Sequence, residues 1–274
     1  MKILYIFPRT TPDPTERGAE HTRRGGILQA AASSGTVVDI RELENCPPAI
    51  ESVRDVYAVA PGIIAMVQRL ENNYDAMIVG CFSDPAVDGA LEGAKIPIVG
   101  CALPSMAAAL LLGRQFAVLS PTRSSAAHVR DLVMAAGLLD RYSGAVPLGI
   151  GVREFAADPA RTQQVVTEAG KRALHLGADV ILLGCLSLAF TGVGDEVQKQ
   201  LGVPVVNPLR IAVRTCEMLV GAGLTPHRCL KENSDALGRQ REALAVARPF
   251  ALPQAGLGEA PIPARPASQV NRVR

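Results

Sequence analysis

The chain alternates between short apolar runs and longer stretches in which apolar residues recur at helical spacing. The short runs are bounded by glycine, proline or aspartate, which is typical of strands buried on both faces. They cover residues 2–7, 36–43, 76–81, 96–100, 115–120, 145–150, 180–185 and 203–206. Helices are predicted within residues 16–34, over 62–73, from Asp84-Pro85 onward, over 105–112, up to residue 136, and over 162–176 and 209–220.

Part of this pattern occurs twice. Asp75 and Asp179 each lead into an apolar run that ends in Gly-Cys-x-Ser, at Cys81 and Cys185, and each unit continues to a second run containing Ile-Pro or Val-Pro. The first strand and its Pro-Arg-Thr loop also match the shape of the later run that ends in Ser-Pro-Thr. Such self-similarity indicates an internal repeat. The chain therefore reads as two similar halves.

Strands that alternate with helices predict an α/β fold with parallel sheets and right-handed crossovers. We expect two similar lobes, each a mostly parallel sheet flanked by helices, related by pseudo-twofold symmetry with a cleft between them. Lobe A is assigned to residues 1–101 plus 208–225, and lobe B to residues 102–207. Residues 226–274 form a C-terminal extension in which 235–248 suits one helix. Beyond about residue 249, prolines and few large apolar residues predict disorder.

Composition excludes several classes of protein. The 274 residues are 48% apolar with a net charge of +2, so a globular protein without a nucleic-acid footprint is expected. A strand begins at Lys2 with no leader pattern before it, and no apolar run approaches bilayer length, so a cytoplasmic protein is expected. Six cysteines without a C-x-x-C pair indicate reduced thiols, and four histidines lack metal-ligand spacing. We expect no metal and no cofactor, a small-molecule ligand, and leave a homo-oligomer open.

Cys81 and Cys185 occupy matched positions at the carboxyl ends of predicted strands, where open parallel sheets bind ligands. Two lobes face to face would place these thiols across one cleft. One thiolate can then remove an acidic proton next to a carbonyl while the opposite thiol delivers another, without a cofactor. Asp84-Pro85 is predicted to cap a helix whose positive end favours a thiolate at Cys81. The remaining cysteines, Cys46, Cys101, Cys216 and Cys229, are interpreted as small hydrophobes.

The loops after these strands supply candidate substrate contacts. The carbanion formed by proton removal places charge on the carbonyl oxygen, which backbone amides and hydroxyls would stabilise. Suitable hydroxyls belong to Thr10, Ser83, Thr122 and Ser187, each of which is equally suited to an ordinary turn or cap. Arg9 suits either a substrate carboxylate or solvent. The predicted substrate-binding residues are Pro8, Arg9, Thr10, Phe82, Ser83, Thr122, Leu186 and Ser187.

Three motifs resemble the aspartate/glutamate/hydantoin racemase superfamily, and within it the hydantoin and allantoin racemase branch. They are Pro-Ala-Ile-Glu-Ser at residues 48–52, Gly-Cys-Phe-Ser-Asp-Pro at 80–85 following Tyr74-Asp-Ala, and Leu-Gly-Cys at 183–185. The likeness covers about residues 1–224. It implies that Cys81 and Cys185 are the two acid/base thiols of a racemase or epimerase. The Asp-Ser-Gly, Cys-Asn-Thr and Cys-Thr-His motifs of glutamate racemases are absent from the sequence.

The sequence also departs from that branch. Its usual Ile-Asn-Pro-Asn-Thr is replaced by Ile-Phe-Pro-Arg-Thr at residues 6–10, and its Cys-Ala-Gly-Met by Cys-Leu-Ser-Leu at 185–188. Both changes would touch the pocket. The best expected substrate is a 5-substituted hydantoin or related ureide. The alternatives are an amino-acid racemase, a decarboxylase or cis-trans isomerase of the same superfamily, or a non-catalytic small-molecule binding protein.

Overall fold

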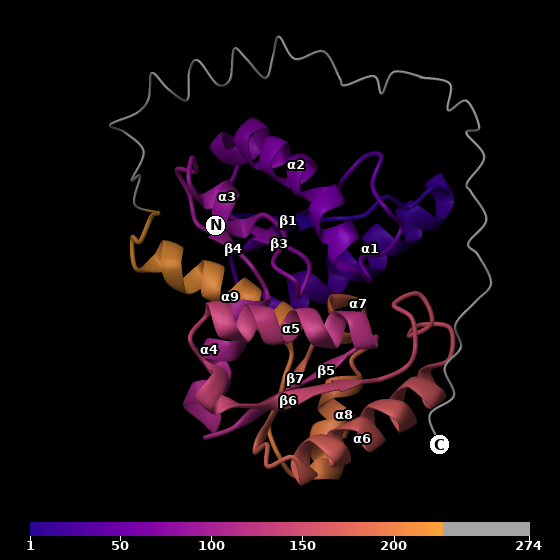
Figure 1. The fold of residues 1–274 in the computed structure, drawn as a ribbon. Coiled ribbons are helices and arrows are strands. Elements are labelled where there is room, and N and C mark those ends of the chain that lie inside the picture. The colour runs from indigo at the N-terminus through magenta and orange to yellow at the C-terminus, as the bar shows by residue number, and fades with distance from the viewer. Residues whose placement is uncertain (227–274) are drawn as a thin grey trace, which may run out of the picture. The chain divides into compact units, whose positions relative to one another are not determined.

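A computed structural model describes residues 1–226. Within these residues, the strands form two parallel sheets of four strands, in the orders β2-β1-β3-β4 and β6-β5-β7-β8 (Figure 1). The first sheet comprises β1 (Lys2–Phe7), β2 (Val37–Glu42), β3 (Ala76–Val79) and β4 (Ile98–Val99). The second comprises β5 (Phe116–Ser120), β6 (Tyr142–Pro147), β7 (Val180–Leu183) and β8 (Val205–Val206). The equal strand orders confirm the repeated α/β architecture.

Strand β1 shows why its sequence is apolar throughout. Side chains alternate between the two faces of a strand, and helices cover both faces of this sheet. Ile3, Tyr5 and Phe7 belong to one buried cluster, while Leu4 and Ile6 belong to another. A strand with only one buried face would alternate between apolar and polar residues instead. The continuous run therefore places β1 in the middle of a covered sheet.

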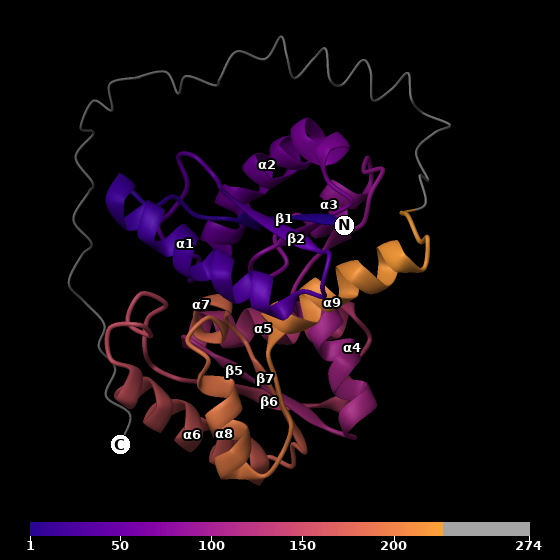
Figure 2. The same ribbon diagram turned by 180° about the vertical axis from the view of Figure 1, so that it is seen from behind.

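Helices α1 (Pro14–Ala31) and α9 (Pro208–Gly221) pack together on one side of the first sheet. Helix α2 (Val53–Leu70) and the short α3 (Val87–Leu91) lie on the other. On the second sheet, α4 (Ala102–Leu112) and α5 (Arg123–Ala135) face α6 (Pro159–His175) and α8 (Val193–Leu201) across the strands (Figures 1 and 2). The four-residue α7 (Leu186–Ala189) follows β7, and short 3-10 turns occupy Glu71–Asn73 and Leu139–Arg141.

Side-chain caps fix where most of these helices begin. Ser52 and Asp55 form a reciprocal capping box at α2, and Thr122 and Ser125 do the same at α5. Asn207 accepts hydrogen bonds from the first amides of α9, ahead of a proline in the first turn. These caps set the exit direction of each loop that leads from a strand end into a helix.

The two sheets share one apolar core. The larger cluster of buried residues includes one face of β1 and of β3, part of α9 and residues from all four strands of the second sheet, and all described residues belong to one compact unit. Helix α9 contacts β3, β4 and α1 as well as α4 and α7. Helix α9 thus contacts elements that the prediction assigns to both lobes, and its grouping with the first sheet stays a prediction. The lobe boundaries at residues 101 and 207 stay a prediction.

Several elements differ from the sequence prediction. Helix α2 begins at Val53, because Ser52 caps it and Pro61 lies inside the helix rather than before it. Strand β6 begins at Tyr142, three residues before the predicted start. The segment between Cys185 and Val203, predicted without bounds as the helical part of a βαβ unit, contains two helices, α7 and α8. The first is a single turn, and the second is bounded by Gly192 and Gly202 in left-handed conformations.

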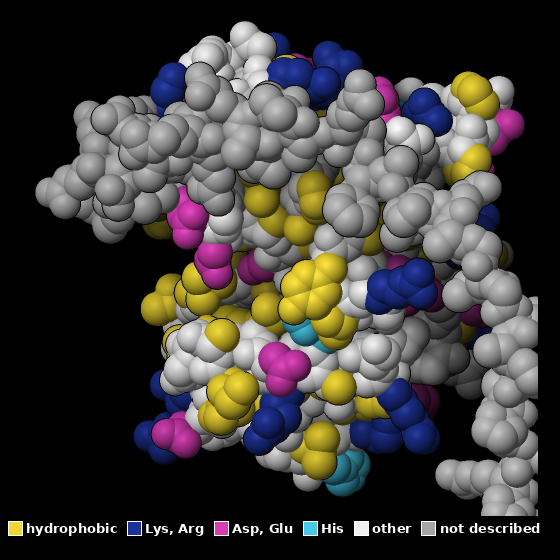
Figure 3. Space-filling view, turned by 45° about the horizontal axis from the view of Figure 1, so that its top comes forward, with side chains coloured by type: hydrophobic (Ala, Val, Ile, Leu, Met, Phe, Trp, Pro, Cys, Tyr) yellow, Lys and Arg dark blue, Asp and Glu magenta, His cyan; other side chains and the backbone are white. Residues whose placement is uncertain are grey.

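The predicted extension lies outside the described residues from 227 onward, including its helix at 235–248 and its disorder beyond about 249. Within residues 1–226, every helix is too short or too polar to cross a bilayer. On the face shown in Figure 3, lysine and arginine side chains of the described residues lie scattered among acidic and hydrophobic ones.

Candidate active site

Cys81 and Cys185 each follow a glycine that lies directly after its strand. A Cβ on Gly80 would overlap the ring of the buried Tyr5. A Cβ on Gly184 would lie 2.7 Å from the carbonyl oxygen of Leu119 on the neighbouring strand. Only glycine permits the chain to pass this close. The Gly-Cys pair therefore sets the path of the chain at the end of β3 and β7.

The two thiols line one cavity of about 60 Å³ between the loops of the two sheets. The first half contributes Phe7, Pro8, Arg9, Ala49, Ile50, Gly80, Cys81, Phe82 and Ser83. The second half contributes Pro121, Ser125, Val152, Gly184, Cys185, Leu186 and Ser187. Sites for drug-sized ligands hold several hundred Å³, so this cavity suits a small substrate.

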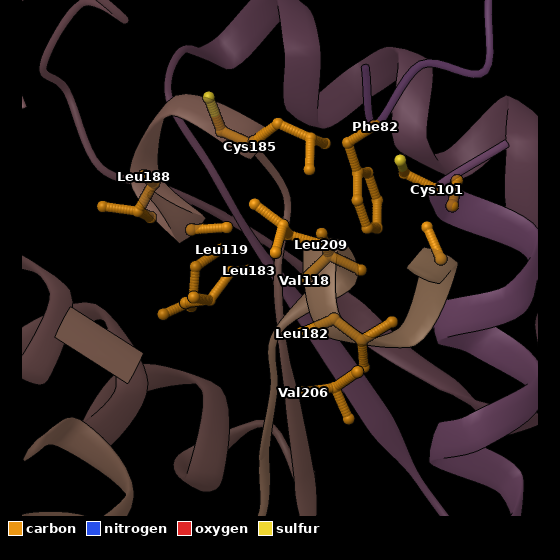
Figure 4. Packing of buried hydrophobic residues seen from close by; sticks show 14 of the residues in the cluster. Phe82, Cys101, Val118, Leu119, Leu182, Leu183, Cys185, Leu188, Val206 and Leu209 are labelled. Atoms are coloured by element: carbon orange, nitrogen blue, oxygen red, sulfur yellow. The ribbon is translucent and has the colours of Figure 1, made fainter. Parts of the chain in front are cut away.

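Figure 4 shows how two of these residues meet the core. The Cys185 sulfur points away from Leu182, Leu183 and Val206, which lie beneath it. Phe82 is 3% exposed and directs its ring into the core, toward Cys101 and Leu209. Phe82 therefore anchors the loop that carries Cys81, while Cys185 remains free to face the cavity.

Six of the eight predicted substrate contacts line the cavity, and Thr10 and Thr122 do not. The hydroxyl of Thr10 donates to the carbonyl oxygen of Leu43 at 2.7 Å and accepts from the amide of Cys46 at 2.9 Å. The hydroxyl of Thr122 accepts from the amide of Ser125 at 3.1 Å in the cap of α5. Both hydroxyls stabilise loops, as expected if these residues are ordinary turn and cap residues.

Sequence reasoning missed the walls of the cavity. Ala49 and Ile50 come from the loop before α2, and Val152 comes from the loop after β6. A Glu51 carboxylate oxygen accepts from the amide of Val152 at 2.7 Å and so joins these two loops. The Pro-Ala-Ile-Glu-Ser stretch at residues 48–52 was a signal for the first loop. The second has no counterpart in the repeat and no periodicity that would have found it.

The loop behind Cys81 differs from the prediction. Asp84 does not cap the helix that follows it, because α3 begins only at Val87 and has no side-chain cap. Its carboxylate instead accepts from the amides of Cys101, Ala102 and Leu103 at 2.5, 2.9 and 3.1 Å, at the start of α4. The backbone of Asp84 has φ of 45°, which turns the side chain toward that distant helix. Burial raises the pKa of Asp84 to about 6, although these three hydrogen bonds lower it.

The two thiols have different surroundings. Burial, together with the Cys185 and Asp84 charges, raises the pKa of Cys81 to about 12, although the amide and side chain of Ser83 lower it. Burial also raises the pKa of Cys185, but amides of Ser187 and Leu188 and the Arg24 guanidinium lower it. The expected helix-end stabilisation of a thiolate at Cys81 is therefore wrong. Cys185 is the thiol that ionises more readily.

Among residues 1–226, the acidic, histidine and cysteine side chains form no group of three that could hold a metal ion. Cys101 and Cys216 are fully buried in the core, and Cys46 lies near the surface with its thiol 3.4 Å from the carbonyl of Glu44. These cysteines lie outside the cavity lining. Cys229 falls outside the described residues.

Comparison with known proteins shows to which proteins the chain is related. The sequence profile of the Asp/Glu/Hydantoin racemase family matches residues 3–216. A hydantoin racemase of Pseudomonas sp. (strain NS671) is 32% identical over 225 residues, which cover 81% of this chain and 87% of that protein. A hydantoin racemase of Paenarthrobacter aurescens is 29% identical over 226 residues, 81% of this chain and 92% of that protein.

A solved structure of similar fold is the allantoin racemase from Klebsiella pneumoniae. It superposes with a TM-score of 0.75 at 25% sequence identity and covers 83% of this chain and 90% of its own. The fold, the repeated sheets and the match over most of the chain agree with one another. The chain is therefore an isomerase of the racemase type and belongs to the Asp/Glu/Hydantoin racemase family.

Proposed function

We propose that this protein is a cofactor-independent racemase in which Cys81 and Cys185 transfer protons at a carbon next to a carbonyl. The observation that carries the proposal is the single cavity lined by both thiols, one from each half of the repeat. A carbon held between them is exposed to one thiol on each face. Such an arrangement suits inversion by two groups, because one proton leaves from one face of the carbon while another arrives at the opposite face.

The two thiols begin each turnover in opposite protonation states. One thiolate removes the α-proton and becomes a thiol, while the opposite thiol gives its proton to the other face and becomes a thiolate. The proton count of the pair is unchanged, and the product leaves the enzyme ready for the opposite enantiomer. Because Cys185 ionises more readily, the small fraction of enzyme that carries one thiolate at neutral pH holds it on Cys185 and keeps the proton on Cys81. Nearby amides of the two Gly-Cys loops would stabilise charge on the carbonyl oxygen.

A 5-substituted hydantoin or related cyclic ureide is the proposed substrate class. Two curated relatives are named hydantoin racemases, and a structural neighbour is named an allantoin racemase. In such rings the reacting carbon lies between a carbonyl and a ring nitrogen, which makes its proton acidic enough for a thiolate base. A small planar ring also suits a cavity as narrow as this one.

The test is a panel of single enantiomers incubated with the protein: several 5-substituted hydantoins, allantoin, aspartate and glutamate. Loss of optical rotation and uptake of deuterium at the α-carbon are measured together. We expect both with at least one hydantoin or ureide and neither with the free amino acids. Turnover confined to the amino acids would assign an amino-acid racemase instead. Binding of the ureides without exchange would indicate a binding protein.

The pKa shifts predict how activity depends on pH. A thiol whose pKa is raised is protonated at neutral pH. At pH values below that pKa, its thiolate fraction increases about tenfold for each unit by which the pH rises. We therefore expect kcat to rise from about pH 7 to about pH 9 and to show no falling limb there, because Cys81 keeps its proton up to about pH 12. Ionisation of the free substrate affects kcat/KM but not kcat. Measuring both across the pH range therefore separates it from ionisation of the enzyme's thiols. A bell centred near neutral pH would contradict the assigned thiol environments.

A further inference from the structure

Among the residues that line the cavity, Arg9 is the one whose side chain carries a formal charge. It follows β1 and Pro8, and its side chain is 14% exposed. The guanidinium carbon lies 4.4 Å from the ring centroid of Phe7, which also lines the cavity. This stacking holds the planar group against the cavity wall. A cation therefore borders a cavity that is otherwise built from apolar, hydroxyl and thiol groups.

The carboxylates near Arg9 are bound more closely by other residues. Arg9 Nη2 donates a long hydrogen bond of 3.5 Å to Glu20, and Arg9 Nε lies 3.8 Å from Glu42, too far for a hydrogen bond. A carboxylate oxygen of Glu20 accepts from Nε of Arg24 at 2.5 Å, and a carboxylate oxygen of Glu42 accepts from the Thr11 hydroxyl at 2.6 Å. The buried Nε of Arg9 has no hydrogen-bond partner within residues 1–226. Arg9 therefore keeps donor capacity that its protein neighbours do not use.

The surrounding network carries an excess of positive charge. Its side chains are four arginines, Arg9, Arg17, Arg23 and Arg24, and two glutamates, Glu20 and Glu42. The excess of two charges falls to one if the exposed Glu16 nearby is counted. Burial lowers the pKa of His21, which contacts Glu42, so His21 is neutral near pH 7.

Arg24 reinforces this charge from behind the cavity. It is 5% exposed, and its guanidinium lies 4.4 Å from the ring of Phe7 and 4.5 Å from the ring of Phe190. Two guanidinium groups thus lie against one aromatic ring that lines the cavity. Glu20 lies between the two groups, 2.5 Å from Arg24 and 3.5 Å from Arg9, and balances one of their two positive charges. An anion arriving in the cavity beside Arg9 would offset the excess.

We propose that Arg9 determines substrate specificity by receiving a carboxylate of the substrate. The inference rests on the proposed function and narrows its substrate class to hydantoins or related ureides whose 5-substituent ends in a carboxylate. The guanidinium offers a planar pair of donors that matches both oxygens of such a group. The thiols then act on the ring carbon while Arg9 holds the far end of the substituent.

The experiment compares 5-(2-carboxyethyl)hydantoin with its primary amide, which has the same shape without the charge. The readout is the ratio of kcat/KM for the acid to kcat/KM for the amide, because a general loss of stability cancels in this ratio. We expect the parent to favour the acid. Arg9→Gln should lower the ratio by about ten- to a hundredfold, the range of a charge-assisted hydrogen bond, and Arg9→Lys should restore part of it.

Arg17→Gln is the matched control, because Arg17 belongs to the same network, contacts Glu42 and lies outside the cavity lining. Its ratio should equal that of the parent. An unchanged ratio in Arg9→Gln, or a parent that prefers the amide, would overturn the inference while leaving the racemase proposal in place. If neither compound is turned over, the racemase proposal fails for this class. Calorimetric titration of both compounds then decides: equal or absent binding overturns the role of Arg9, and tighter acid binding lost in Arg9→Gln supports it.

Discussion

Replacing Cys81 or Cys185 with serine is expected to lower racemisation of a confirmed substrate by about 10²–10⁴-fold. Serine keeps nearly the same shape, but its hydroxyl is a far weaker acid than a thiol. The group can then neither hold a negative charge near neutral pH nor serve as the matched acid. Both residues line the cavity, so the loss should appear in kcat for each single variant. Racemisation rates from polarimetry provide the measurement.

Cys101→Ser and Cys216→Ser are the controls for this prediction. Both residues are fully buried and lie outside the cavity lining, and the Cys101 thiol is 3.3 Å from the carbonyl oxygen of Val79. They should change stability more than chemistry, with kcat near that of the parent. A Cys81→Ser or Cys185→Ser protein that racemises at nearly the parent rate would show that the two-thiol mechanism is wrong.

Gly184→Ala is expected to lower the free energy of unfolding by about 1–3 kcal/mol and to reduce activity as well. The added Cβ would lie 2.7 Å from the backbone oxygen of Leu119 and 2.7 Å from a methyl of Val118. Because backbone cannot give way as a surface side chain does, the turn carrying Cys185 must shift. Urea denaturation measures the loss, and kcat measures the displacement of the thiol.

Gly26→Ala is the matched control for this substitution. Gly26 lies on the exposed side of α1, and a Cβ there meets nothing within 4 Å. Alanine should therefore stabilise the protein by about 0.5–1 kcal/mol, as expected for a helix interior. If Gly184→Ala unfolds at the same urea concentration as the parent and keeps full activity, the close approach of Gly184 to Leu119 and Val118 affects neither stability nor function.

The sequence predicted the strands well because a strand covered on both faces must be apolar along its length. It also predicted that Cys81 and Cys185 lie at strand ends, because the same Gly-Cys pattern follows two apolar runs. Helix α2 begins nine residues before the predicted start at Gly62, and Pro61 lies inside the helix. Local signals place an element in sequence, whereas packing decides how far it extends.

The site was harder to predict than the fold because several of its features depend on partners remote in sequence. Asp84 binds amides 17 to 19 residues away rather than those of the next helix. Thr10 and Thr122 have residue types suited to a substrate, yet their hydroxyls serve neighbouring loops. The cavity walls at Ile50 and Val152 follow no repeat or periodicity. Residue type names what a side chain can do, and only the fold selects which partner it meets.

The most direct test of the two-thiol account is α-proton exchange in deuterated water with each pure enantiomer of a confirmed substrate. The parent should exchange both enantiomers, and enzyme-free samples should set the background. Each serine variant retains one thiol and so one base, which faces one enantiomer only. The account predicts that Cys81→Ser exchanges one enantiomer and Cys185→Ser exchanges the other, as followed by loss of the α-proton signal. Exchange of the same enantiomer by both variants, or of both enantiomers by either one, would contradict it.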